Sequence, residues 1–94
     1  MNINRPKAKI SNYLMEQLEK KFPSATKKQL QNASKRMGEI VHFLVNIPLC
    51  ESAAVGIGFS VKQSSEDIAK ENNLDGDTVC KIIFDAAHLF RETA

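Results

Sequence analysis

Hydrophobic residues recur along this chain at intervals of three and four positions, which is the period of helices that bury one face. The first such run has Ser11 as a possible N-cap in front of it and Pro23 as a stop behind it. Its apolar positions are Leu14, Leu18 and Phe22. The pattern predicts a first helix over residues 12–22.

A longer run follows, with Ser24 or Thr26 as its cap and Asn46 and Pro48 as its end. Its buried stripe is predicted to contain Leu30, Ala33, Met37, Ile40, Val41 and Leu44. This second helix should have about five turns and be the longest element.

The segment from 49 to 61 is apolar but contains two glycines, which favours a short helix followed by an irregular link. Ser64 or Ser65 is then expected to cap a further short helix, because Glu66 and Asp67 would lie in its first turn. Asn73 tolerates a left-handed turn, and Asp75 caps a final helix that runs to about residue 91.

These elements predict an all-α fold of about five helices, with no convincing strand. Residues 1–10 are expected to form a flexible basic arm, and residues 11–94 a single helical domain, since 94 residues are too few for two domains. The most apolar window, 40–59, has Pro48 and Glu51 near its middle, so we interpret it as two hinged helical segments and predict no membrane span. Two cysteines and a charged N-terminus favour a cytoplasmic protein.

A recognisable constellation lies in residues 65–84. Its spaced positions are Ile68, Ala69, Asn73, Leu74, Val79 and Ile82. This spacing resembles the helix-turn-helix of bacterial and phage repressors, in which a small residue lets the second helix approach and later apolar residues pack on the first. Asn73 stands where that pattern usually has glycine. The resemblance implies a tri-helical corner whose second helix reads DNA, with Thr78 and Lys81 as candidate contacts.

The charge distribution does not coincide with this motif. Residues 1–60 carry a net charge of +5 and residues 61–94 a net charge of −3. Basic residues come in doublets, of which Lys27 with Lys28 and Lys35 with Arg36 should share one face of the second helix. These four side chains are candidate phosphate contacts; a solvated face and a surface for an acidic protein partner are the alternatives.

The last helix is apolar round much of its circumference, which predicts burial on more than one side. We therefore expect a homodimer whose interface contains Phe84, Leu89 and Phe90.

No catalytic or cofactor signature is present, so no enzyme and no cofactor are predicted. The glycines at 56 and 58 lack the partners of a phosphate loop. Four residues of zinc-ligand type lack the short loop spacing of such sites, and no metal site is expected. They are His42, Cys50, Cys80 and His88.

Together these features predict a small dimeric DNA-binding transcriptional regulator of bacterial, plasmid or phage type. The alternative is a protein-protein interaction module, such as an inhibitor, adaptor or chaperone, that uses the basic helix face or the apolar last helix.

Overall fold

The computed structural model describes residues 4–46 and 51–92, and it describes side-chain surroundings for residues 9–46 and 56–91. The chain forms four helices in these ranges, α1 (Asn4–Lys21), α2 (Lys27–Asn46), α3 (Glu51–Asn72) and α4 (Gly76–Glu92). No strand occurs within the ranges described. The all-α prediction is confirmed, whereas the predicted number of five helices is wrong.

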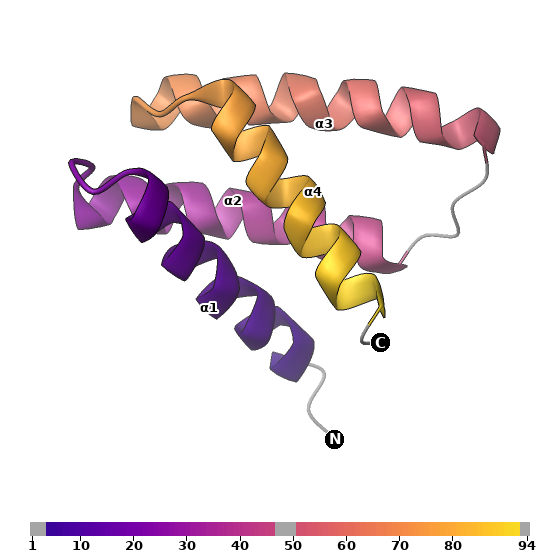
Figure 1. The fold of residues 1–94 in the computed structure, drawn as a ribbon, viewed down its shortest axis with the longest axis horizontal. Coiled ribbons are helices and arrows are strands. Elements are labelled where there is room, and N and C mark those ends of the chain that lie inside the picture. The colour runs from indigo at the N-terminus through magenta and orange to yellow at the C-terminus, as the bar shows by residue number, and fades with distance from the viewer. Residues whose placement is uncertain (1–3, 47–50, 93–94) are drawn as a thin grey trace.

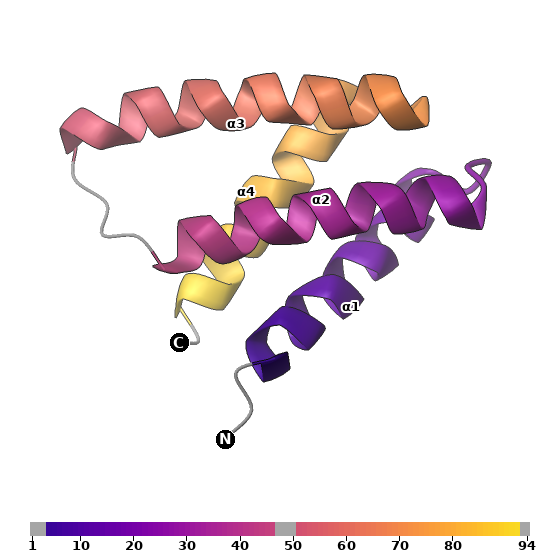
Figure 2. The ribbon, with the colours of Figure 1, turned by 180° about the vertical axis from the view of Figure 1, so that it is seen from behind.

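The four helices are arranged in two layers (Figures 1 and 2). Helices α2 and α3 run antiparallel in one layer, and α1 and α4 cross them obliquely in the other. The Cα atoms extend over 37 × 33 × 16 Å. The shortest dimension fits two stacked helices, whose axes pack about 8–10 Å apart.

All four helices contribute to one hydrophobic core between the layers. Met37 and Val41 of the stripe predicted for α2 are fully buried, as are Val79 and Ile83 of α4, whereas Ile40 of that stripe is half-buried. Burial of each such side chain stabilises the fold by about 1.5–3 kcal/mol.

Helix α1 begins earlier than predicted, so residues 4–10 are helical and not part of an arm. Pro6 lies in the first turn, where the missing N–H has no intrahelical partner to lose. Ile10 is buried and extends the four-residue repeat of Leu14 and Leu18 by one turn. Ser11 consequently lies inside the helix and is not its cap.

Helix α3 joins two segments that the sequence pattern separates. Ser65 is buried, and its hydroxyl donates a hydrogen bond to the carbonyl of Val61 at 2.7 Å. A serine that bonds its own preceding turn is satisfied inside a helix and does not need to begin one. The predicted break at Ser64 or Ser65 is therefore wrong, and this merger explains the count of four helices.

Three of the predicted helix ends are confirmed. Thr26 caps α2 by a reciprocal pair of hydrogen bonds with Gln29, 2.8 Å from the Thr26 N–H to the Gln29 side chain and 3.1 Å in the other direction. Asn73 has a φ of 57°, and the Leu74 N–H donates to the Ala69 carbonyl at 2.8 Å, which closes α3 with a Schellman motif. Asp75 caps α4.

Candidate interaction site

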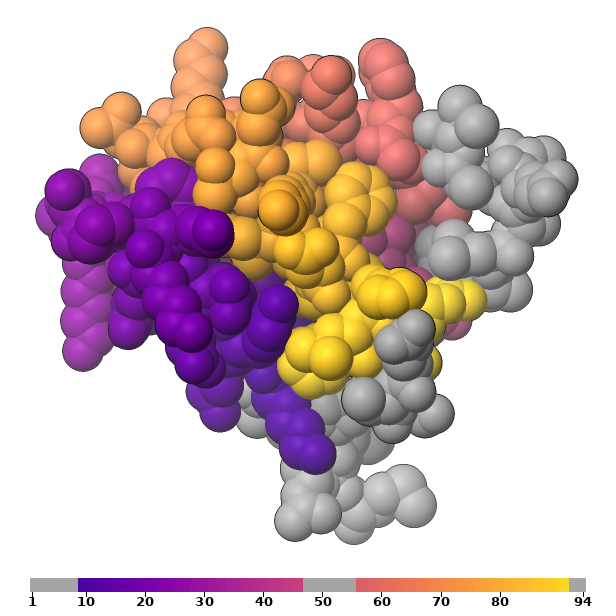
Figure 3. All heavy atoms as spheres, in the orientation of Figure 1, coloured from indigo at the N-terminus to yellow at the C-terminus, as the bar shows by residue number. Residues whose placement is uncertain are grey.

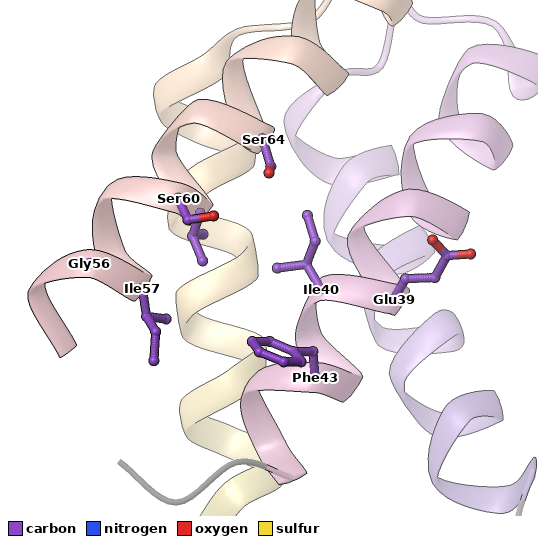
Figure 4. Close-up of a pocket in the computed structure, with 8 residues that line it drawn as sticks. Glu39, Ile40, Phe43, Gly56, Ile57, Ser60 and Ser64 are labelled. Carbon is purple, nitrogen blue, oxygen red and sulfur yellow. The ribbon is translucent and has the colours of Figure 1, made fainter. Parts of the chain in front are cut away.

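A cavity of about 390 Å³ opens between α2 and α3 (Figure 4). Ile40 and Phe43 of α2 and Ile57 of α3 supply its apolar walls. On the α3 side, the facing positions at intervals of four are Gly56, Ser60 and Ser64. These side chains are too small to fill the space opposite Ile40 and Phe43, so the two helices leave a cleft between them. We call this feature the α2–α3 cleft.

Two phenylalanines of α2 and α3 are largely exposed. Phe43, which lines the cleft, has 56% of its surface exposed, and Phe59, which precedes the lining residue Ser60 on α3, has 73%. Phenylalanine is among the residues most often buried, so two exposed rings on the helices that form an unfilled cavity require an explanation. The sequence pattern missed both of them: Phe43 lies off the buried stripe of α2, and Phe59 fell in the predicted link.

A second, smaller cavity of about 240 Å³ lies on the α4 side of α3. Ile57 lines both cavities, together with Leu44, Gly58 and Phe84 in the smaller one. The Arg91 guanidinium donates a hydrogen bond to the Leu44 carbonyl at 2.8 Å and so ties the end of α4 to α2. The first half of α3 therefore has space on two sides.

The predicted dimer residues of α4 have different surroundings. Phe84 and Leu89 are each 41% exposed. Phe90 is half-buried and meets Tyr13 of α1 edge to face, with ring centroids 5.7 Å apart. The Phe90 ring thus already packs within its own chain, whereas Phe84 and Leu89 keep exposed surface.

The four basic candidates on α2 do not share one surface. Lys35 lines a groove between α1 and α2, together with Ser11 of α1 and Glu39 of α2. Arg36 instead forms an ion pair with Glu71 of α3, and this hydrogen bond raises the pKa of Arg36. The doublet is split because successive residues of a helix point about 100° apart.

Lysines do gather where α1 ends and α2 begins, at one edge of the molecule (Figure 1). This lysine corner contains four exposed side chains, Lys20, Lys21, Lys27 and Lys28. Lys20 also lies 3.6 Å from the carboxylate of Glu16. The adjoining turn of α1 adds two carboxylates, Glu16 and Glu19, and Lys21 also lines a groove with Asp77 and Asp85 of α4.

The start of α4 is acidic. Lys81 has Asp77 one turn before it and Asp85 one turn after it, and all three line a groove between α1 and α4. Figure 3 shows these two helices side by side on one face of the molecule. Burial in this groove raises the pKa of Tyr13, and the charges of Asp85 and Glu16 add to the effect.

Thr78 is occupied by the cap of α4. The Asp75 carboxylate accepts hydrogen bonds from the Thr78 N–H at 2.9 Å and from the Thr78 hydroxyl at 2.6 Å. These two bonds lower the pKa of Asp75. The backbone N–H and the hydroxyl of Thr78 are therefore both used in the cap of α4.

The spaced residues on either side of the turn between α3 and α4 belong to the core. Ile68, Ala69, Val79 and Ile82 are buried, and a Cβ added at Gly76 would be in ordinary contact with Glu66. Helix α3 is nevertheless 22 residues long, in place of the short first helix that was expected. The packing accounts for the residues of the resemblance, and the DNA-reading role of α4 stays a prediction.

The zinc candidates remain scattered in the described part of the chain. No group of three metal-ligating side chains occurs there, and Cys80 is a half-buried free thiol. Cys50 lies outside the described residues. His42 Nδ1 is buried without a hydrogen-bond partner, and the Asn46 side-chain amide donates to the His42 backbone carbonyl at 2.7 Å.

No protein-family model, curated protein or solved structure matches this chain. None of the helices within 4–46 and 51–92 combines the length and apolar character that crossing a membrane requires. The surfaces described above are therefore the basis for assigning a function.

Proposed function

We propose that this chain is a non-enzymatic protein-protein interaction module, and that the α2–α3 cleft docks the apolar face of a partner's helices. The observation that supports this is the largely exposed Phe43 ring in the wall of an unfilled cavity, with a second exposed ring, Phe59, on the other helix that forms it. A rim of exposed aromatic surface round a hollow is typical of protein interfaces, whose energetic centres are enriched in large side chains that enter pockets.

The composition of the cleft indicates the chemistry of its partner. Glu39 is the only charged residue among the eight that line it. The cleft runs between two antiparallel helices, and apolar side chains spaced at three and four residues on a partner helix match such a groove. The partner surface is therefore helical and apolar at its centre.

The test uses a displayed library of amphipathic helical peptides, selected against the full chain. Selected peptides should carry apolar residues at helical spacing. They should lose about tenfold or more in affinity on Phe43→Ser, because the substitution removes a ring that the bound peptide would bury. Leu89→Ser is the matched control, since it removes a similarly exposed apolar side chain from α4. Peptides that bind both variants equally, or no peptide at all, would contradict the proposal.

The predicted DNA-binding regulator is the second candidate, and the lysine corner supports it. Exposed lysines at the junction of two helices can neutralise phosphates of a duplex without reading its sequence. The acidic start of α4 weighs against docking of that helix, because Asp77 and Asp85 flank Lys81 and would meet a negatively charged backbone. In this candidate the lysine corner, and not α4, supplies most of the affinity.

Sedimentation with a mixed-sequence DNA duplex at about 50 and 200 mM salt tests the DNA-binding candidate, since phosphate contacts weaken steeply over this range. Lys27→Glu with Lys28→Glu should abolish most of the binding and flatten its salt dependence. Lys62→Glu is the control, because Lys62 is exposed on α3 away from the corner. Lys81→Ala should act mainly on sequence preference, and no binding at the lower salt would remove this candidate.

A further inference from the structure

We infer that the partner in the α2–α3 cleft is a second copy of this chain, related to the first by a two-fold axis that runs along the cleft. This inference rests on the proposed function and names the occupant of the same site. It also places the homodimer interface on α2 and α3 in place of α4.

Two rows of charges of opposite sign, one on each helix, lie along the α2–α3 layer, whose outer face Figure 2 shows toward the viewer. Residues 27–36 of α2 carry four basic side chains and no acidic one. Residues 66–71 of α3 carry three acidic side chains and one lysine. The ion pair of Arg36 with Glu71 shows that the two rows lie at the same level along the layer.

The apolar residues of this face lie at the other end of the layer. Phe43 and Ile57 line the same cleft, so the second half of α2 lies beside the first half of α3. Phe59 follows on α3, and its ring points to solvent. The face is therefore charged at one end and apolar at the other, with both helices contributing to each end.

A two-fold axis parallel to the helices places α2 of one copy over α3 of its partner and preserves position along the layer. Lys28 and Lys35 of α2 then face the partner's acidic row, and the same contact is repeated by symmetry. At the apolar end, the Phe43 ring of one copy comes to the level of the partner's Phe59. A single two-fold rotation thus brings opposite charges of the two copies together and covers both exposed rings.

Helical spacing brings suitable side chains to this face. On α2, Lys28, Lys35 and Phe43 lie at intervals of seven and eight and are all exposed. On α3, Phe59 and Asp67 lie eight residues apart and are exposed as well. The expected contacts across the interface are Lys35 with the partner's Asp67, and Phe43 with the partner's Phe59.

Sedimentation equilibrium of the full chain over a range of protein concentrations tests the inference. The unmodified chain should form dimers, and Phe43→Ser with Phe59→Ser should weaken self-association by at least about tenfold. Both substitutions are at exposed positions, so the fold should persist, as circular dichroism will show. Leu89→Ser should leave the dimer unchanged; a dimer that Leu89→Ser weakens and the phenylalanine variant does not would overturn the inference.

A charge exchange supplies a second readout. Lys35→Asp and Asp67→Lys should each weaken the dimer, and the two together should restore it, because the pair is then reversed across the interface. Failure of the combined variant to recover would contradict the proposed axis.

The failure of this inference and that of the proposed function are distinguishable. A chain that stays monomeric at all concentrations overturns the second copy as partner. If selected peptides then still bind in a manner that depends on Phe43, the cleft docks a different protein. If they do not, the protein-interaction function fails as well.

Discussion

Asn73 determines how α3 ends. Its φ of 57° lies in the left-handed region, where L-residues other than asparagine, aspartate and glycine are strained by about 1–2 kcal/mol. We predict that Asn73→Ala lowers the free energy of unfolding by about 1 kcal/mol, whereas Asn73→Gly leaves it equal or higher. Urea unfolding of the two variants checks this, and a glycine variant less stable than the alanine variant would show that the Asn73 side chain has a separate role.

Asp75 makes the capping of α4 dependent on pH. The two hydrogen bonds from Thr78 lower its pKa in the folded chain, so the stabilisation is complete above the ordinary aspartate pKa and is lost as the pH falls through the lowered value. We predict that Asp75→Ala is less stable than the unmodified chain at pH 7 and that this difference shrinks below about pH 4.

Urea unfolding at several pH values between about 2 and 7 measures the effect of Asp75. Asp75→Asn is the control, because asparagine also caps helices but does not titrate, so its stability relative to Asp75→Ala should not depend on pH. A constant difference between the unmodified chain and Asp75→Ala would contradict the capping role of the carboxylate.

Among the elements, α3 contributes to the core from Val61 onward, whereas its two glycines have open space beside them. Val61, Ser65 and Ile68 are buried, whereas a Cβ added at Gly56 or Gly58 would meet no other atom within 4 Å. Glycine inside a helix costs roughly 0.5–1 kcal/mol relative to alanine because the unfolded chain is more flexible. At Gly56 and Gly58, α3 therefore keeps its helical conformation without a side chain that packs on another helix.

We therefore predict that Gly56→Ala and Gly58→Ala each raise the free energy of unfolding by about 0.5–1 kcal/mol, since neither new methyl group has a neighbour to displace. Thermal and urea unfolding measure the change. Gly38→Ala is a useful comparison, because its Cβ would lie 3.8 Å from Leu14 and 3.9 Å from the Ser11 hydroxyl, in ordinary contact. Loss of stability at Gly56 would indicate that a partner or a closer packing of the cleft occupies that space.

At the scale of the whole molecule, charged and apolar surfaces are separated. The turn from α1 to α2 and the turn from α3 to α4 lie at the same edge, one carrying the lysine corner and the other carboxylates (Figure 1). The exposed rings of Phe43 and Phe59 lie toward the other ends of α2 and α3. In the proposed dimer, Lys20 and Lys21 of α1 lie outside the interface between the two α2–α3 layers.

A dimer through the cleft makes thermal stability depend on protein concentration, because association stabilises only the folded state. We predict that Tm rises with concentration for the unmodified chain and for Leu89→Ser. It should become independent of concentration for Phe43→Ser combined with Phe59→Ser. Differential scanning fluorimetry over a hundredfold range of concentration measures this, and a constant Tm for the unmodified chain would contradict the dimer.

Local signals in the sequence were sufficient for α2, for the all-α class and for most of the helix ends. The repeats at three and four residues identified the buried face of α2, and capping residues located Thr26 and Asp75 correctly. Asn73 was identified as the left-handed residue because its short amide side chain tolerates that conformation. Each of these features depends on residues within one or two turns of each other.

Tertiary contacts decided the rest. Ser65 has the same side chain as a helix cap, and only its burial in the core next to Val61 shows that it lies inside one continuous helix. Arg36 and Glu71 are 35 residues apart, so their pairing, which splits the basic stripe, depends on the packing of α2 on α3. The cleft likewise depends on small α3 residues facing Ile40 and Phe43, because the shape of a surface is set by the packing of distant helices and not by the period within one.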